Sequence, residues 1–322
     1  MRTVTGIPGF FKNMGFEVFE NYECDGQIEL EDALWSRKVD LEYKAIERIK
    51  MASEMSLYHY GKPLVCTYSG GKDSDVLLTL FIRSGVPFEV LNNHTTVDAP
   101  QTFYHTRDKF KELEAKGIKS TIHKPQMTMW ELIEHKTMPP CRMQRYCCSE
   151  LKENSTPHRF VATGVRWDES TKRAKRGIME TTNKDAKKRL VLENDNDERR
   201  LLIEKCETKA EMVINPIIDW THRDIWDYIR SEHINYNPLY DCGYKRVGCI
   251  GCPMAGKRRW KEFADFPTYQ RAYIRAFDKM LKRINAVGKK TKWKSGYDVF
   301  LWWMEDENTE GQMDLFEDGF VE

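Results

Sequence analysis

Short apolar runs alternate along the chain with stretches in which apolar residues recur at helical spacing. Residues 63–67 and 87–91 are such runs, and residues 76–82 between them have an apolar helical pattern that ends at Gly85. Two later apolar runs occupy residues 118–123 and 160–165. Because strands that alternate with helices form parallel sheets, we predict an α/β fold with a doubly wound parallel sheet that binds ligands at the carboxyl ends of its strands.

Changes in this pattern divide the chain into three parts. They are an N-terminal helical lead-in (1–58), an α/β domain (59–240) and a mostly helical, cysteine-bearing C-terminal region (241–322). Within the second part, residues 171–211 are highly charged, and their apolar residues are almost confined to 190–192 and 201–203. Either these two runs form a hairpin, or the segment is a charged excursion or a mobile lid.

Bulk composition narrows the class of protein. The formal net charge is +1, so any surface for a polyanion must be local rather than global. We find no N-terminal signal pattern and no apolar run of the roughly 20 residues that a membrane helix needs. We therefore expect a soluble, cytoplasmic protein without a membrane partner. The sequence does not specify an oligomeric state, and a dimer is compatible with it.

A glycine-rich turn joins the first strand to the helix that follows it. This arrangement directs free N–H groups and the positive end of the helix dipole at one point, which favours an anion such as phosphate. An ordinary strand–helix turn is the alternative. Asp73 is a candidate Mg²⁺ ligand or a carboxylate that stabilises the helix start. The candidate phosphate-binding residues are Ser69, Gly70, Gly71, Lys72, Asp73 and Ser74, with Lys72 as the cation.

Cysteines supply the second chemical signal. The chain has nine of them, and Cys249 and Cys252 form a CxxC motif, about a hundred residues after the adjacent pair Cys147 and Cys148. Four thiolates suffice for an iron–sulfur cluster or a tetrahedral zinc ion. Spacing alone does not choose between them, although adjacent cysteines are awkward for zinc. Cys141 and Cys242 are further candidates, for a cluster ligand or a sulfur-carrying thiol.

Together with Gly164-Val165-Arg166 and the Asn-Pro-Ile-Ile-Asp-Trp segment at 215–220, these features resemble one family. The chain is similar to the phosphoadenosine-phosphosulfate (PAPS) reductase-like branch of the PP-loop ATP pyrophosphatases, a HUP-like fold, over residues 60–265. The resemblance implies a nucleotide site that includes Asp98, Gly164 and Arg166, with Lys72, Asp73 and Arg166 as catalytic residues. It also implies that a 4Fe–4S cluster, favoured over zinc, is held by Cys147, Cys148, Cys249 and Cys252.

Two departures from the reductases shape the functional hypothesis. Reductases of this family have a degenerate phosphate loop, whereas Ser-Gly-Gly-Lys-Asp-Ser is intact here, and no cysteine follows Cys252 to serve as their C-terminal nucleophile. We therefore favour an enzyme that uses ATP and Mg²⁺ to adenylate a substrate for sulfur transfer, as in the DNA phosphorothioation sulfurtransferase and tRNA thiolases. A cysteine desulfurase would then be a candidate sulfur donor. The alternatives are a PAPS or adenylyl-sulfate reductase that uses an external thiol, and a nucleotide-sensing, nucleic-acid-binding module without turnover.

The last part of the chain contains two segments that could bind a partner. Residues 257–294 are rich in Lys and Arg with interleaved aromatics, which favours nucleic acid; the alternative is a pair of amphipathic helices with an aromatic core. In the acidic tail, Gln312, Leu315 and Phe316 resemble the QxxLF peptide that docks on the DNA sliding clamp. Packing of the tail on the body is the alternative to a clamp partner.

Overall fold

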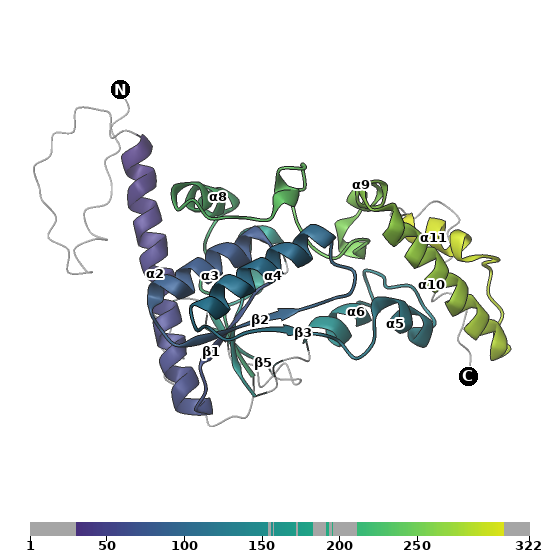
Figure 1. Cartoon of the computed structure of the whole chain (residues 1–322), viewed down its shortest axis with the longest axis horizontal. Coiled ribbons are helices and arrows are strands. Elements are labelled where there is room, and N and C mark those ends of the chain that lie inside the picture. Colours follow the sequence, from purple (N-terminus) through teal and green to yellow (C-terminus); the bar gives the residue numbers. More distant parts are fainter. Residues whose placement is uncertain are drawn as a thin grey trace, which may run out of the picture. The chain divides into compact units, whose positions relative to one another are not determined.

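Seven strands form one sheet in the order β3-β2-β1-β4-β7-β5-β6 (Figure 1). The structure is a computed structural model that describes residues 30–153, 156, 158–171, 173–182, 191–192, 195 and 211–305. Contacts divide the chain into two units, Met1–Glu42 and Tyr43–Glu322, and helix α2 (Leu30–Tyr60) belongs to both. Everything that follows concerns the second unit.

The first five strands in this order are parallel to one another. The connections reverse direction between β1 and β4, which is the switch point of a doubly wound sheet and the place where such sheets bind ligands. The predicted α/β fold is therefore confirmed. The parallel strands are β1 (Leu64–Thr67), β2 (Phe88–Asn93), β3 (Ser120–His123), β4 (Phe160–Ala162) and β7 (Glu211–Ile214).

Part of the charged segment extends the sheet. Strand β5 (Met179–Thr182) pairs antiparallel with β7, and β6 (Val191–Leu192) pairs antiparallel with β5. Residues 191–192 of the first apolar run thus pair with β5, a strand that the sequence pattern did not predict. The second run, at 201–203, lies outside the described residues. Buried Met179 and Leu192 explain why this edge adheres to the sheet.

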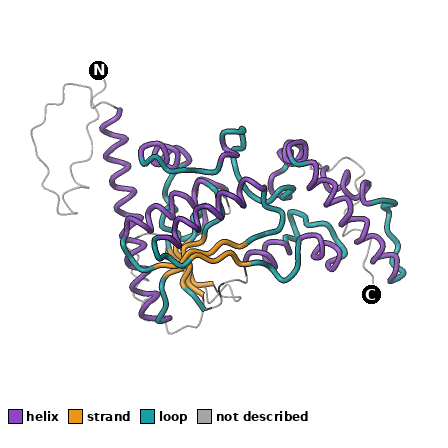
Figure 2. The backbone as a smooth tube through the Cα atoms, in the orientation of Figure 1, coloured by secondary structure: helices purple, strands orange, loops and turns teal. Residues whose placement is uncertain are grey.

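Helices surround the strands (Figure 2). Helix α3 (Lys72–Ser84) follows β1 and ends at Gly85, whose φ of 69° only glycine adopts readily. Helix α4 (Pro100–Ala115) begins with a proline, whose fixed φ suits the first turn of a helix. Helix α8 (His222–Ser231) is capped by Thr221, whose side chain accepts a hydrogen bond from the N–H of Asp224.

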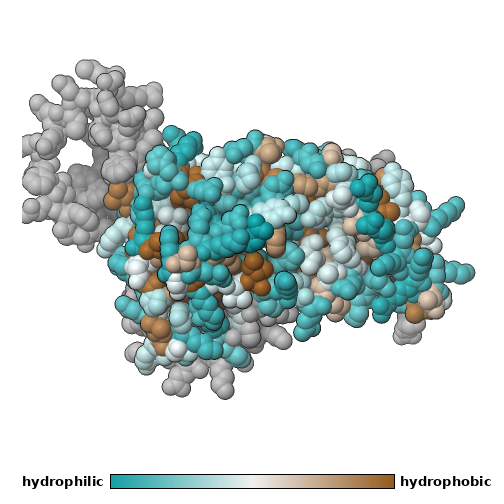
Figure 3. Space-filling model, in the orientation of Figure 1, coloured by the Kyte–Doolittle hydropathy of each residue, from teal (hydrophilic) through white to brown (hydrophobic). Residues whose placement is uncertain are grey.

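The C-terminal helices share a core with α5 (Met129–Lys136). These helices are α9 (Arg258–Asp265), α10 (Pro267–Ala286) and α11 (Gly296–Met304). Tyr273 and Phe277 are buried in that core, so these aromatics serve packing, whereas the lysines and arginines of α10 are exposed. The face over α9–α11 in the space-filling view is accordingly mostly hydrophilic (Figure 3).

No helix of the described residues is long and apolar enough to cross a membrane. The tail residues 312–316, proposed above as a clamp-binding peptide, lie outside the part of the chain that the structure describes.

Candidate active site

The glycine-rich turn lies at the switch point, between β1 and α3, as its sequence predicts. Gly70 has a φ of 71°, and a Cβ atom there would lie 2.8 Å from Oγ1 of Thr106. Both the backbone conformation and the space therefore require glycine at this position. The side-chain amide of the fully buried Asn237 donates to the carbonyl of Gly70 (2.9 Å), which ties the turn to a distant segment.

The two serines of the turn have different surroundings. The hydroxyl of Ser74 donates to the carbonyl of Gly71 (2.7 Å) and accepts from the Gly71 N–H (3.1 Å), so it closes the turn. The hydroxyl of Ser69 lies 3.4 Å from that of Ser74 and lines the cavity above the turn. Ser69 is therefore the freer of the two hydroxyls to contact a ligand.

A compact charge cluster stands at the start of α3. The Nζ atom of Lys72 lies 2.8 Å from one carboxylate oxygen of Asp73, and Nε of Arg166 lies 2.7 Å from the other. Lys72 and Arg166 are only 4% and 3% exposed, and Arg166 also donates to the carbonyl of Trp220 (3.2 Å). Asp168 lies 3.6 Å from Arg166, so the cluster holds two buried cations and two carboxylates that are more exposed. Buried cations suit an anionic ligand. Because cations occupy both oxygens of Asp73, its role toward Mg²⁺ stays a prediction.

Tyr240 is a site residue that sequence reasoning missed. It ends the short 3-10 turn η5 (Pro238–Tyr240), and its hydroxyl accepts a hydrogen bond from the backbone N–H of Lys72 (3.1 Å). That N–H is one of the free donors at the start of α3 on which a phosphate would be expected. The tyrosine hydroxyl thus occupies part of the anion site. Nothing in the local pattern around residue 240 signals this contact, because it joins residues 168 positions apart.

His222 is a second residue that the pattern did not reveal. It opens α8, its backbone N–H donates to Asp168 (2.7 Å), and it lines the same cavity as Lys72. Partial burial, with the nearby charges of Lys72 and Arg166, lowers the pKa of the His222 imidazole below its ordinary value of 6.5. The imidazole is therefore neutral at pH 7 and can accept a proton.

A buried polar network supports the turn from behind. The hydroxyl of Tyr68 donates to Asp75 (2.5 Å), and Nε2 of His105 lies 3.0 Å from the same carboxylate oxygen. All three side chains are buried, and burial raises the pKa of Asp75, against the opposing effect of His105. The side-chain amide of Asn92 adds a hydrogen bond to the carbonyl of Tyr68 (2.8 Å). These contacts fix the strand end from which the turn departs.

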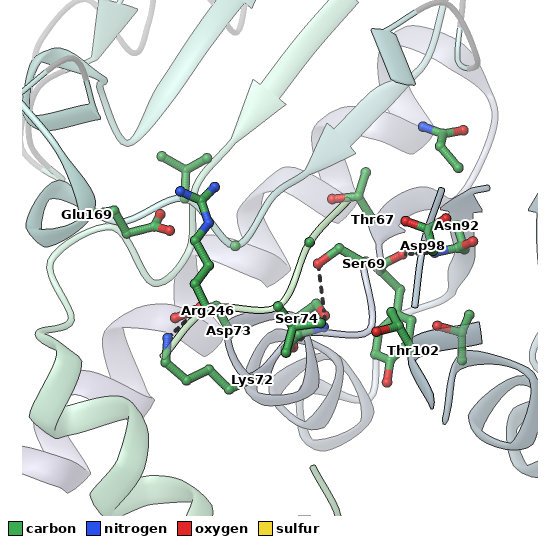
Figure 4. Close-up of a pocket in the computed structure, with 18 of the residues that line it drawn as sticks. Thr67, Ser69, Lys72, Asp73, Ser74, Asn92, Asp98, Thr102, Glu169 and Arg246 are labelled. Atoms are coloured by element: carbon green, nitrogen blue, oxygen red, sulfur yellow. Dashed lines mark hydrogen bonds and ion pairs between the residues drawn. The ribbon is translucent and has the colours of Figure 1, made fainter. Parts of the chain in front are cut away.

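These elements enclose a cavity of about 590 Å³ (Figure 4). Figure 4 shows Lys72, Asp73 and Ser74 at the start of α3, with Glu169 and Arg246 reaching the same space from other segments. The volume lies within the range of small-molecule and cofactor pockets. Of the predicted nucleotide-site residues, Gly70 alone shapes the turn without lining the cavity; the others line it, namely Ser69, Gly71, Lys72, Asp73, Ser74, Asp98, Gly164 and Arg166.

Asp98 connects this cavity to the cysteines. Its carboxylate accepts from the N–H of Thr95 (2.8 Å), and its carbonyl accepts from the hydroxyl of Tyr269 (2.7 Å). Asp98 also forms an isolated antiparallel β-bridge with Cys249, and the N–H of Ile250 donates to the carbonyl of Val97 (2.8 Å). The CxxC motif is thus tied by backbone contacts to a loop of the nucleotide cavity.

The four predicted metal ligands gather at this corner. Cys147 and Cys148 lie in α6 (Tyr146–Cys148). A hydrogen bond with Cys148 and then burial raise the pKa of the Cys147 thiol, and the nearby Cys249 and Cys252 act in the same direction. Each of these cysteines is a free thiol. Within the described residues, however, no three His, Cys, Asp or Glu side chains are placed closely enough to hold a metal ion, so the ligand set stays a prediction.

The remaining candidate cysteines have other surroundings. The Sγ atom of Cys141 accepts from the N–H of Gln144 (3.3 Å), and Cys242 is exposed on the loop after η5. In the CxxC loop itself, Gly251 has a φ of 75°, and a Cβ there would lie 2.7 Å from the ring of Phe263. The loop therefore requires glycine between its two cysteines in order to pack on the C-terminal core.

Comparison with known proteins places the chain in a family. A family model described as the phosphoadenosine phosphosulfate reductase domain matches residues 63–255, well over half of the chain. The chain belongs to the phosphoadenosine phosphosulfate reductase domain family. The match covers the glycine-rich turn, Arg166 and all four predicted cysteine ligands, so the family resemblance inferred from the sequence is confirmed at this level.

Relatives of this family member carry different names. Adenosine 5′-phosphosulfate reductase 1 of Bacillus subtilis (strain 168) is 29% identical over 200 residues, which are 60% of this chain and 75% of that protein. The uncharacterized protein MJ0973 of Methanocaldococcus jannaschii is 27% identical over 286 residues, 86% of this chain and 59% of that protein. Among solved structures, phosphoadenylyl-sulfate reductase from Candida auris aligns with a TM-score of 0.43 and 19% identity, over 69% of this chain and 95% of that one.

Proposed function

We propose that this protein cleaves ATP between the α and β phosphates and attaches the AMP part to an acceptor, which prepares the acceptor for sulfur transfer. The observation that carries the proposal is the intact glycine-rich turn, with the buried ammonium of Lys72 beside it, at a cavity of about 590 Å³. Backbone N–H groups, a helix N-terminus and two buried cations, Lys72 and Arg166, together favour a polyphosphate.

The proposed reaction assigns a task to each group. An oxygen of the acceptor attacks the α-phosphorus, the bond from that phosphorus to the bridging oxygen breaks, and pyrophosphate leaves with the electron pair. Lys72, Arg166 and the N–H groups of the turn stabilise the charge that develops on the phosphates. Neutral His222 takes the proton that the acceptor loses. A sulfur nucleophile supplied by another molecule, such as the persulfide of a cysteine desulfurase, then displaces AMP.

Cysteines 147, 148, 249 and 252 are proposed to hold an iron–sulfur cluster. Their donor chemistry fits, because all four side chains are thiols, the other three lie near Cys147, and the glycine between the last two lets the loop fold tightly. Such a cluster would supply an iron site that binds sulfur. Iron and acid-labile sulfide, measured on anaerobically purified protein, should drop several-fold in Cys249→Ser and be unchanged in Cys242→Ser. One zinc ion with no sulfide would contradict the cluster.

A second candidate is the reduction of an adenylyl sulfate. The comparisons support this activity better than adenylation, because the family model and the Bacillus relative are both named for a reductase of this kind. In that reaction a thiolate attacks the sulfur of the adenylyl sulfate, the S–O bond breaks, and AMP leaves. Because no cysteine follows Cys252 in this sequence, an external thiol is the natural nucleophile and, in a second step, the source of the electrons that release sulfite.

One set of assays separates these activities. Anaerobically reconstituted protein is incubated either with ATP, Mg²⁺ and mixed nucleic acids or with adenylyl sulfate and a dithiol. Pyrophosphate from the first mixture and no sulfite from the second supports adenylation. Sulfite without pyrophosphate supports the reductase, and neither product, with nucleotide still bound, supports a sensing module. Lys72→Ala should abolish the pyrophosphate signal, which excludes a contaminating enzyme.

A further inference from the structure

A second cavity, of about 350 Å³, adjoins the nucleotide cavity. Both cysteines of the CxxC motif, Cys249 and Cys252, line it, whereas neither lines the nucleotide cavity. The two spaces share one wall, formed by Lys152, Lys245, Arg246, Gly248 and Arg258. A ligand in the second cavity would therefore lie directly beside a ligand in the first.

The shared wall is cationic. Four of its five residues carry a positive charge, and the side chains of Lys245 and Arg246 have no hydrogen bond or ion pair within the described part of the chain. Arg258 donates only to a backbone carbonyl, that of Ala255 (3.2 Å). Figure 4 draws Arg246 on the same side of the nucleotide cavity as Lys72 and Asp73. Lys152 interacts with Cys249 and Asp98, and Arg258 lies near Glu262, so Lys245 and Arg246 are the cations of this wall that are open to a phosphate within the described residues.

Elsewhere the second cavity has apolar and aromatic surface, together with Glu262, whose carboxylate accepts from the N–H of Gly251 (2.8 Å). The ring of Tyr244 lines it, held by a hydrogen bond from its hydroxyl to Asp265 (2.6 Å) and by the ammonium of Lys261, 4.7 Å from the ring centre. Met254 and Ala255 add apolar atoms from the CxxC loop, and Met254 is 47% exposed. An aromatic face with a flexible thioether suits a flat ring. The volume lies within the range of ligand pockets.

We propose that the second cavity binds one nucleotide unit of the acceptor, with the base against Tyr244 and Met254 and its phosphate on Lys245 and Arg246. The source is a nucleic-acid strand whose target nucleotide is unstacked, since a duplex would not present a base to a cavity of this size. An acidic protein segment would use the cations but would leave the apolar and aromatic surface unexplained.

This assignment of the second cavity rests on the proposed function, in which the acceptor must lie beside ATP. The phosphate of the bound nucleotide lies on the wall shared with the nucleotide cavity, and its base lies beyond that wall. The acceptor strand is thus placed beside the ATP that it would attack.

Binding can be measured without ATP, so that failure of the proposed function does not mask the result. The probe is a single-stranded 12-mer that contains one 2-aminopurine and carries a fluorescein label. Anisotropy gives the dissociation constant, and stacking on Tyr244 should quench the 2-aminopurine fluorescence in an unlabelled copy of the strand. Met254→Glu places a negative charge at the mouth of the cavity and should weaken binding at least fivefold. Tyr244→Phe should keep most of the affinity, whereas Tyr244→Ala should lose between about fivefold and a hundredfold.

The matched controls are Met127→Glu, which alters another exposed methionine, and Arg230→Ala, which removes an arginine on α8 outside both cavities. Each should bind the strand within twofold of the unaltered protein. If 2-aminopurine ribonucleoside monophosphate binds as tightly as the strand, the cavity is still a nucleotide site, but its ligand is a free nucleotide rather than a nucleic-acid strand. Equal effects of Met254→Glu and Met127→Glu, or full displacement by a poly-glutamate peptide with no 2-aminopurine quenching, would overturn the assignment.

Discussion

Lys72→Ala should weaken ATP binding about 30- to 140-fold while the fold remains in place. The ammonium of Lys72 is buried and lies 2.8 Å from Asp73, which also pairs with Arg166 at 2.7 Å. Removing the ammonium leaves Asp73 with a cationic partner, so no buried carboxylate is left unpaired. The variant should therefore fold.

The magnitude follows from the charges at the start of α3. Lys72→Ala removes one of the two buried cations that pair with Asp73 and Asp168, so the charge of this group falls by one and its attraction for a polyphosphate weakens. A hydrogen bond to a charged group contributes about 1.5 to 3 kcal/mol. We take the upper part of that range, about 2 to 3 kcal/mol, because the site is shielded from water, and each 1.4 kcal/mol is a tenfold change in affinity.

Isothermal titration calorimetry with ATP and Mg²⁺ measures this change, and far-ultraviolet circular dichroism checks the fold. The control is Lys119→Ala, which removes an exposed lysine that pairs only with Glu89 at 3.3 Å and lines neither cavity. Its affinity should match that of the unaltered protein. A folded Lys72→Ala protein that binds ATP within twofold of the unaltered protein would refute the assignment of the glycine-rich turn to the phosphates.

Three further predictions follow from the same geometry. Tyr240→Phe frees the N–H of Lys72 for a phosphate oxygen, so calorimetry should show ATP binding about two- to tenfold tighter; weaker binding would mean that the hydroxyl contacts the ligand. Because its pKa is lowered, folded His222 binds a proton less readily than the unfolded chain, so its contribution to the free energy of unfolding should fall as the pH drops below 6.5. An NMR titration should show that Lys72→Ala moves this pKa back toward 6.5, and an unchanged value would exclude Lys72 as a cause. Gly251→Ala should lower the free energy of unfolding by about 3 kcal/mol or more in denaturant titrations, against about 1 kcal/mol for Gly243→Ala, which has a similar φ but open space; equal losses would contradict the tight packing.

The order of strands and helices was predictable because local chemistry sets it. Apolar runs became β1, β2, β3 and β4, and the cap at Thr221 began α8, since these signals depend on residues within one turn or strand. Strand β5 was not predicted. It contains Glu180 and two threonines in a charged neighbourhood, and it is a strand because it pairs with β7 and β6. A part-buried ion pair between Glu180 and Arg176 balances the buried carboxylate.

In the candidate site too, the parts set by local sequence were predictable and the parts set by long-range contacts were not. The glycine-rich turn could be located from sequence because its chemistry lies within seven residues. Tyr240, His222 and Asn237 could not, because their relation to the turn depends on how segments about 150 residues later fold back over it. The two cavities and their shared cationic wall likewise arise from tertiary packing: no short motif announces that Lys245 and Arg258 lie beside Lys152.

The central claim is that the enzyme breaks ATP at the α–β bond and passes AMP to an acceptor. The most direct measurement uses ATP labelled with ³²P at the α position, incubated anaerobically with Mg²⁺, nucleic acid and the reconstituted protein, and separated by thin-layer chromatography. We predict label attached to the nucleic acid and labelled AMP, whose sum equals the pyrophosphate released, and all three products should be absent in Lys72→Ala. Labelled ADP, or intact ATP together with sulfite release from adenylyl sulfate, would contradict the account.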